Sequence, residues 1–312
     1  MDNKLKKTLD VNGLETPFVN DTLNKTLKHY IGLDFYANTV DDDLIILWEE
    51  LGKEADGLIG SQTGYGTRDA YALVMRMLRE KITSFCDKLE ERLNTEAENV
   101  KNKELDFLKT LYPALVVNDI ATSKILFAPI DNRDTVKQFV ERTKKNIVRS
   151  YDNALRSGYL FGQSSQDVKN MVANNIKQVE RGMESGIKTA VPSFAKTTDR
   201  IVFLQNNKEV VYCATLDGRT CITCGSMHGL RYKSITEAPS IPQHCLCRCV
   251  YIAADDAKNE MPTYEEFLNT LSEEEQKEIL GKNRYEMWKN DGIKLERFVD
   301  NGRKLRLDEI DK

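Results

Sequence analysis

Long stretches of the chain repeat apolar residues at steps of three and four, which is the period of an amphipathic α-helix. One such stripe runs along residues 67–112, a second along 134–158 and a third along 164–191. Each stripe covers only one side of its helix, so each helix needs a neighbour to bury that side. The pattern therefore predicts a bundle or an elongated arrangement of antiparallel helices over 67–191.

Capping and helix-terminating residues mark the ends of these predicted helices. Ser164 and Asp167 open the third stripe with the spacing of a capping box. Gly158 follows the second stripe and is a plausible terminator. The residues predicted to face a core are Leu73, Met77, Leu78, Ile82, Phe85, Leu89 and Leu93 in the first stripe, Val136, Phe139, Val140, Thr143, Ile147, Tyr151, Ala154 and Leu155 in the second, and Val168, Met171, Val172, Ile176, Val179 and Met183 in the third.

The period changes after Pro192. Residues 200–205 and 209–215 are rich in β-branched and aromatic side chains and flank a polar Asn-Asn-Lys turn, which is typical of a β-hairpin. Residues 248–253 form a similar run and predict a returning strand. Helical spacing resumes over 263–299, where Gly281 predicts a stop between two helices.

The patterning thus predicts an α+β fold, with mainly helical N-terminal and central regions followed by a small β-rich module and C-terminal helices. A glycine-rich break at 57–69 separates the start of the chain from the helices, and it contains no phosphate-binding glycine motif. The predicted segments are a partly irregular leader (1–66), a helical domain (67–192), a β-rich Cys/His module (193–254) and a C-terminal helical segment (255–312).

Composition narrows the class of protein. The chain has 312 residues, of which 40% are hydrophobic and 30% charged, and its net charge is −4. It shows no apolar core of a secretory signal and no run of about 18 apolar residues, so we expect synthesis in the cytosol and no membrane anchor. Residues 133–200 hold 13 Lys and Arg against 7 Asp and Glu. This basic stretch could face DNA or an acidic protein surface, or it could be the solvated side of the helices.

Cysteine is concentrated in one place. Residues 217–249 contain five of the seven cysteines and two of the three histidines. Cys221 and Cys224 form a CxxC pair, and a second run begins at His244 and continues through Cys245, Cys247 and Cys249. Two short pairs of thiolate and imidazole ligands are the usual way to build a tetrahedral zinc site. The candidate ligands are Cys221, Cys224, His244, Cys247 and Cys249.

The spacing predicts one structural zinc ion but leaves its ligand set open. His244 with Cys247 keeps the spacing of the first pair, while Cys249 and Cys245 compete for the remaining position. Disulfides formed outside the cytosol, or reduced thiols that only pack, are the alternatives to metal. A catalytic Cys–His pair would need one activated thiol rather than five. His228 is expected to be a turn or surface residue and not a ligand.

The order of these residues resembles the phage minor head proteins of the head-morphogenesis family, which is related to phage Mu protein F. That family has approximately a D-x-R-x-C-x-x-C segment, a following L-x-G, and then P-x-H-x-x-C-R-C. The matching residues here are Asp217, Arg219, Cys221, Cys224, Gly229, Pro242, His244, Cys247, Arg248 and Cys249. Met227 replaces the leucine, and Cys245 stands where relatives often carry proline. The likeness is most specific over 213–252.

The resemblance implies a structural role in the phage particle. Such proteins associate with the portal protein during head assembly, some contact capsid or scaffold proteins, and some accompany or contact the double-stranded genome. The expected location is the virion, in the head interior or at the portal vertex, after synthesis in the host cytoplasm. Asp217 and Arg219 are expected to form a turn that orients the CxxC loop.

Two other classes of function stay open. A zinc-dependent nucleic-acid-binding protein would need a concentrated basic surface near the metal, where Arg219, Arg231, Lys233 and Arg248 lie without aromatic stacking residues. A hydrolase or toxin-like enzyme would need a catalytic motif, and neither HExxH nor GxSxG occurs. We therefore expect no enzymatic activity.

Overall fold

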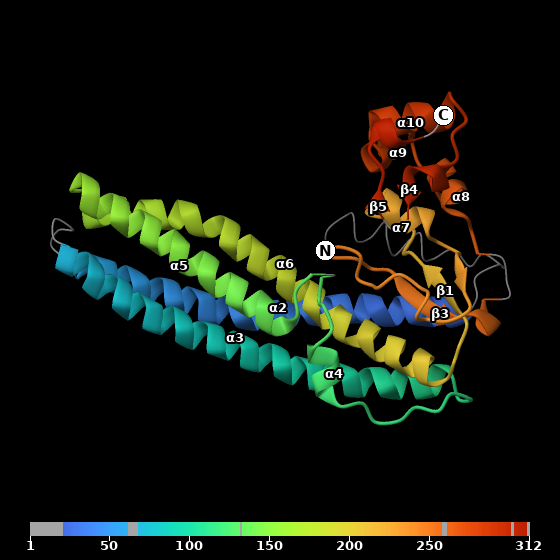
Figure 1. Ribbon diagram of the computed structural model, residues 1–312, viewed down its shortest axis with the longest axis horizontal. Helices are drawn as coiled ribbons and strands as arrows, with labels where there is room; N and C mark the ends of the chain where they lie inside the picture. Colours follow the sequence, from blue (N-terminus) through green and yellow to red (C-terminus); the bar gives the residue numbers. More distant parts are fainter. Residues whose placement is uncertain (1–20, 62–67, 132, 258–260, 301–302, 311–312) are drawn as a thin grey trace. The chain divides into compact units, whose positions relative to one another are not determined.

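The computed structural model describes residues 21–61, 68–131, 133–257, 261–300 and 303–310 (Figure 1). Of the residues that the structure describes, 69% are helical, and a small antiparallel sheet and a few short strands lie near the C-terminus. The predicted α+β class, mainly helical, is therefore confirmed. None of the described helices is both long and apolar enough to cross a membrane.

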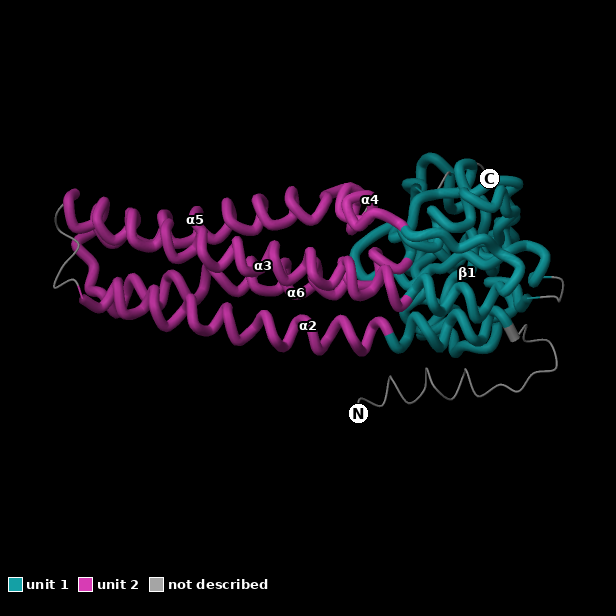
Figure 2. Tube along the Cα trace, turned by 90° about the horizontal axis from the view of Figure 1, so that it is seen from below, with its two compact units in different colours: residues 1–32, 104–119, 196–312 teal, residues 33–103, 120–195 magenta. Residues whose placement is uncertain are grey.

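The chain forms two compact units, which Figure 2 colours separately. Unit 1 takes its described residues from 1–32, 104–119 and 196–312, and unit 2 consists of 33–103 and 120–195. These units cut across the segments drawn from the sequence, because three long helices contribute residues to both. They are α2 (Asp21–Gly60), α3 (Arg68–Leu111) and α6 (Ser165–Gln205).

Unit 2 is helical, and its core follows the first two predicted stripes closely, whereas only Val168, Val172 and Met183 of the third are buried. It also contains α4 (Thr122–Leu126) and α5 (Val136–Phe161). Every α5 residue predicted to face a core is buried. On α3 the stripe is buried from Leu78 onward, but Leu73 and Met77 are 41% and 38% exposed. Burial of one side of each helix explains why the threefold and fourfold spacing is kept.

Capping residues fix where the helices of unit 2 begin and end. Thr135 and Gln138 form a capping box at the start of α5, and Ser164 and Asp167 exchange the predicted hydrogen bonds before α6. Gly158 does not end α5, so that prediction was wrong. The helix continues for one more turn to Gly162, whose φ of +60° supplies the left-handed C-cap that favours glycine.

The predicted leader is largely helical. Residues 21–60 form the single helix α2 rather than an irregular segment, while 1–20 and 62–66 lie outside the described residues. Some helix was expected in this leader, but its full length was not, because the buried side includes small and acidic residues that interrupt the pattern of large apolar side chains. Ala37, Asp41 and Ala55 are each no more than 1% exposed.

The predicted hairpin was also wrong in its first strand. Residues 200–205 belong to α6, which runs through Pro192 to Gln205. A short apolar run such as Ile201–Val202–Phe203 fits a strand or a buried helix equally well from periodicity alone. Burial decides for the helix, since Ala195, Thr198, Val202 and Phe203 are buried at steps of three, four and one.

Unit 1 contains a three-stranded antiparallel sheet in the order β2-β1-β3. The strands are β1 (Val210–Cys213), β2 (Arg231–Tyr232) and β3 (Val250–Ala253). Every residue of β1 and β3 is buried, and Val211 lies opposite Ile252. The predictions of strands at 209–215 and 248–253 are therefore confirmed, although β1 pairs with β2 and β3 and not with 200–205.

The C-terminal part of unit 1 builds its own apolar core from short elements. The helices are α8 (Tyr264–Asn269), α9 (Glu273–Leu280) and α10 (Lys282–Lys289), and Gly281 separates the last two as predicted. A 3₁₀ turn, η2 (Leu295–Phe298), precedes the hairpin of β4 (Val299–Asp300) and β5 (Arg303–Lys304). The core residues are Ile222, Tyr264, Phe267, Leu268, Leu280, Trp288, Ile293, Leu295, Phe298 and Ile310.

Candidate metal centre

The first pair of candidate ligands sits at the start of a short helix. Helix α7 spans Ile222–Ser226, and Cys221 is its N-cap residue. The Cys221 thiol accepts the backbone N–H of Cys224 at 3.5 Å, as a capping side chain does. Capping brings the two sulfurs to the same side of the first helical turn, where they can meet one ion.

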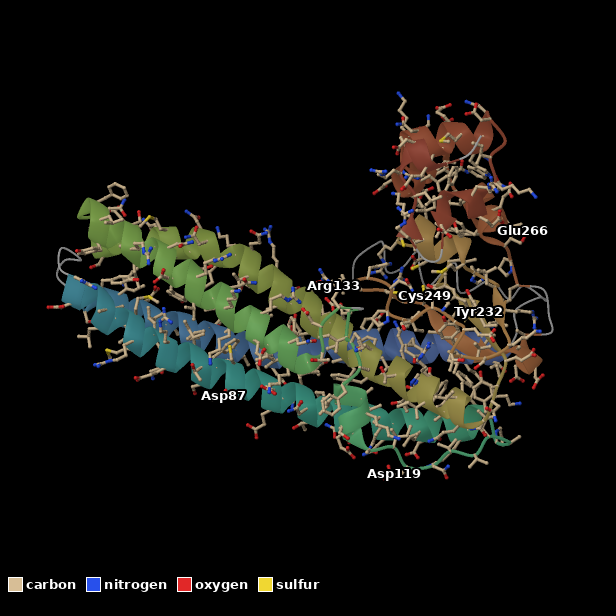
Figure 3. All side chains as sticks on the ribbon, in the orientation of Figure 1. Asp87, Asp119, Arg133, Tyr232, Cys249 and Glu266 are labelled. Carbon is tan, nitrogen blue, oxygen red and sulfur yellow. The ribbon has the colours of Figure 1, made fainter. Side chains whose placement is uncertain are left out.

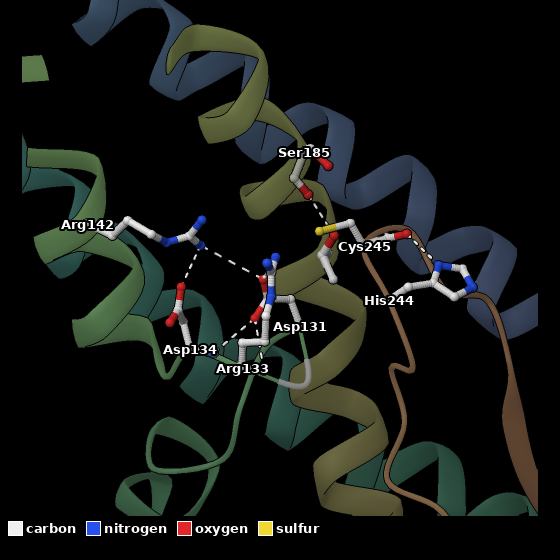
Figure 4. A network of polar contacts seen from close by, with 8 residues as sticks. Asp131, Arg133, Asp134, Arg142, Ser185, His244 and Cys245 are labelled. Atoms are coloured by element: carbon white, nitrogen blue, oxygen red, sulfur yellow. Dashed lines mark hydrogen bonds and ion pairs between the residues drawn. The ribbon is translucent and has the colours of Figure 1, made fainter. Parts of the chain in front are cut away.

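The second run of ligands approaches from a tight turn. The Cys247 N–H donates to the His244 carbonyl, and Leu246 between them has a φ of +58°. His244 Nδ1 lies 2.8 Å from the Cys245 carbonyl oxygen (Figure 4). A carbonyl oxygen only accepts, so Nδ1 carries the hydrogen and the lone pair of Nε2 is left for a metal.

The sulfurs and the imidazole converge. His244 Nε2 lies 3.3 Å from the Sγ of Cys221 and 3.3 Å from that of Cys224, and the Sγ atoms of Cys224 and Cys247 are 4.0 Å apart. Two overlapping groups result: Cys221, Cys224 and His244, and Cys224, Cys247 and Cys249. These five residues, which we call the Cys/His cluster, could hold a metal ion.

All five residues of the cluster were predicted from the sequence, and the structure brings them together. Cys249, labelled in Figure 3, is buried immediately before β3. Cys245 belongs to neither group. His228 lies in a turn as predicted, but it is half-buried, and its Nδ1 accepts the backbone N–H of Ala214 at 3.0 Å. All seven cysteines are free.

Hydrogen bonding within the cluster sets its protonation. The Cys224 thiol and then His244 lower the pKa of Cys221 to about 4, and the bond to Cys221 raises the pKa of His244 to about 9. The thiols of Cys224 and Cys249 lower the pKa of Cys247, whereas burial raises that of Cys249. The cluster therefore favours the thiolate form, which binds metal, at Cys221 and Cys247, and a bound metal would displace the proton that His244 Nε2 shares with Cys221.

An ion pair ties the two ligand-bearing segments together. The Arg248 guanidinium donates to both carboxylate oxygens of Asp217, with Nη2 2.5 Å from Oδ1. Asp217 Oδ1 also accepts the backbone N–H of Arg219 at 2.8 Å, which forms the expected turn before the CxxC pair. The Arg219 side chain contributes less, because its guanidinium is 3.9 Å away and 59% exposed.

Lys196 is a contact that sequence reasoning missed. Its side chain is 2% exposed, and its ammonium donates to the backbone carbonyl of Cys247. This contact was not predicted, because the segment that contains Lys196 was assigned to the β-rich module rather than to the end of α6. The position of Arg248 between two candidate ligands suggested a role at the site. Its ion pair with Asp217 could not be predicted from the spacing of residues along the chain.

A small cavity of about 20 Å³ lies at the cluster. Cys221, Cys224, His244 and Cys249 line it together with Arg219 and Leu246, among others. Its size suits a single ion or water molecule rather than an organic substrate.

Comparison with known proteins identifies no relative. No protein-family model, curated protein or solved structure matches this chain.

Proposed function

We propose that the chain is a minor head protein of a tailed bacteriophage, folded in part around one structural zinc ion held by the Cys/His cluster. The observation that carries the proposal is the convergence of the family-like motif in space. Asp217, Arg248 and the five cluster residues meet, although 31 positions separate Asp217 from Arg248.

Zinc suits the donor set and its spacing. Tetrahedral zinc with Zn–S bonds of about 2.3 Å holds two thiolates roughly 3.8 Å apart, and a thiolate and an imidazole nitrogen roughly 3.6 Å apart. The corresponding separations here are 4.0 Å between Cys224 and Cys247 and 3.3 Å between His244 and either thiol of the CxxC pair. Either Cys247 or Cys249 completes a set with Cys221, Cys224 and His244.

Two observations favour a structural role for the ion over a catalytic one. The cavity at the cluster, about 20 Å³, is too small for a substrate. Helix α7, which carries Cys224, also places Ile222 in the C-terminal apolar core. A metal that holds α7 therefore supports the packing of the C-terminal helices, which is the role of ions in structural zinc sites.

The role in the head rests on the resemblance and is tested by assembly. The purified chain is mixed with the portal protein encoded beside it and sedimented, with empty and DNA-filled capsids as comparisons. Saturable binding at a few copies per portal ring is the expected result. Failure to bind either the portal or capsids would overturn the proposal.

A second candidate function is binding of nucleic acid through helix α5 rather than through the Cys/His cluster. The observation that favours it is a set of exposed basic residues along α5, which includes Lys137, Lys145 and Arg149. Phosphate contacts by such residues would make DNA affinity fall steeply with salt. A measured affinity without that salt dependence would remove this candidate.

A further inference from the structure

Unit 1 contains a buried acidic pair distinct from the Cys/His cluster. Glu104 on α3 and Asp199 on α6 are 0% and 5% exposed. Two residues of α2, His29 and Tyr30, lie against them. Buried carboxyl groups are rarely left without a cation, so their remaining partners decide what this pair can do.

Each carboxyl group has one donor from α2. The Tyr30 hydroxyl donates to Asp199 Oδ2 at 2.6 Å, and His29 Nε2 lies 2.6 Å from Glu104 Oε2. The His29 ring is fixed by stacking on Phe107, with 3.8 Å between ring centroids. Burial lowers the pKa of His29, so the neutral ring donates through an Nε2–H.

The second oxygen of each carboxyl group accepts no hydrogen bond from any described residue. Among the described residues, Glu104 Oε1 and Asp199 Oδ1 are buried and have no donor. The two carboxyl groups are neighbours, since consecutive residues of α2, His29 and Tyr30, hold them and each group shifts the pKa of the other. An ionised carboxylate only accepts, so a bond between two carboxyl groups needs a proton on one of them.

The other polar and charged side chains nearby form hydrogen bonds with groups other than these two carboxyl groups. On α6, the Lys196 ammonium lies 5.6 Å from the centre of the Tyr30 ring and donates to the Cys247 carbonyl. At the end of α3, the Tyr112 hydroxyl accepts the backbone N–H of Ala253. Arg200 is directed to the Ala238 carbonyl. Within the described part of the chain, no lysine or arginine forms an ion pair with Glu104 or Asp199.

We infer that Glu104 and Asp199 share one buried proton, and that this proton joins α3 to α6 within unit 1 as a pH-sensitive contact. Holding the proton gives Glu104 Oε1 and Asp199 Oδ1 a partner. Losing it places two carboxylates side by side in an apolar setting, where each disfavours the other.

The sign of the pH effect follows from burial. Desolvation raises the pKa of Glu104 to about 7 and that of Asp199 well above its usual value. Both carboxyl pKa values are thus higher in the folded than in the unfolded protein. The stabilisation is complete below the unfolded values near pH 4 and is lost as the pH rises through about 7.

The test uses thermal unfolding of the full chain at about pH 6 and about pH 8. We expect the wild-type midpoint to fall by roughly 3 °C or more between them. Glu104→Gln should abolish most of that fall, because an amide N–H can donate to Asp199 Oδ1 without titrating, while the amide oxygen still accepts from His29. An unchanged pH dependence in Glu104→Gln would overturn the inference.

A matched control separates this effect from the general cost of replacing a buried carboxylate. Glu96 lies on the same helix and is 1% exposed, but its oxygens meet the Tyr36 hydroxyl and the Arg92 guanidinium. Glu96→Gln should lower the midpoint equally at both pH values. If Glu104→Gln fails to fold, infrared spectra of the wild type decide. A protonated-carboxyl band near neutral pH that vanishes at alkaline pH supports the inference, and its absence overturns it.

Discussion

Cys224 is the residue that both groups of the Cys/His cluster share. Cys224→Ser removes a ligand whether Cys247 or Cys249 completes the set. We expect the wild type to be purified with about one zinc per chain and the variant to lose nearly all of it, since a thiolate is replaced by a poor ligand. Elemental analysis of the purified proteins measures this directly.

Cys245 supplies the control for that experiment. It lies one position from His244 but belongs to neither group, so Cys245→Ser should retain its zinc. Equal zinc content in all three proteins would mean that the ion is bound elsewhere.

The Asp217–Arg248 pair offers a second prediction at the level of single residues. The two side chains are 5% and 15% exposed, so removing one leaves a largely buried charge without its partner. We expect Asp217→Ala to lower the free energy of unfolding by about 3 kcal/mol. Arg219→Ala, which removes an exposed guanidinium, should cost less than about 1 kcal/mol.

Tryptophan fluorescence during urea unfolding can measure these differences. Trp288 lies in the C-terminal apolar core, and a Trp48→Phe background leaves it as the sole tryptophan. Similar losses in Asp217→Ala and Arg219→Ala would show that the ion pair with Arg248 does not hold the two segments.

At the scale of elements, helix α7 joins the candidate ligands Cys221 and Cys224 to the C-terminal core. A Cβ atom on Gly225 would lie 2.3 Å from the Tyr264 ring, so the helix and the ring approach as closely as glycine allows. We expect Gly225→Ala to destabilise the protein by about 1–3 kcal/mol, because Tyr264 would have to leave its place in the core.

Gly218 provides the comparison, since a Cβ atom there meets nothing within 4 Å. Gly218→Ala should leave the unfolding midpoint nearly unchanged, as measured by calorimetry. A loss in Gly218→Ala as large as that in Gly225→Ala would point to backbone freedom, and not the contact with Tyr264, as the cause.

The elements that could be predicted are those whose burial is one-sided. The buried face of helix α5 was foreseen as far as Leu155, because large apolar side chains mark most of that face. The extent of helix α2 was not predicted, because Ala37 and Asp41 occupy core positions. The end of α6 was predicted as a strand, because three apolar residues in a row fit the period of a strand and of a helix equally well. Gly158 was chosen over Gly162 because spacing alone does not reveal which glycine adopts a positive φ.

For the whole molecule, metal removal should act unevenly. Chelation of the proposed zinc ion would free the candidate ligands on and beside α7, so we expect faster hydrogen exchange in α8, α9 and η2, whose core includes Ile222. Helix α5 belongs to unit 2 and buries its apolar side there, so its exchange should change little. Equal acceleration in both sets of helices would contradict a local role for the ion.

The residues of the Cys/His cluster could be predicted from the sequence, whereas the contacts between distant helices could not. The cluster could be found because its candidate ligands lie within 29 positions, from Cys221 to Cys249, in the short pairs that zinc sites favour. The partners of Lys196, Glu104 and Asp199 could not, since they come from distant parts of the chain and depend on how the helices of unit 1 pack.

Unit 1 also constrains how the protein is made. Tyr30 binds Asp199, 169 residues later, whereas every residue of unit 2 has been synthesised by position 195. At about 5–20 residues per second, the start of α2 waits roughly 10–30 s on the ribosome for its partners. Its apolar residues Leu23 and Tyr30, buried in the finished protein, must be kept from aggregating during that time. On this timescale the contact with Glu104 becomes available to the start of α2 well before the contact with Asp199.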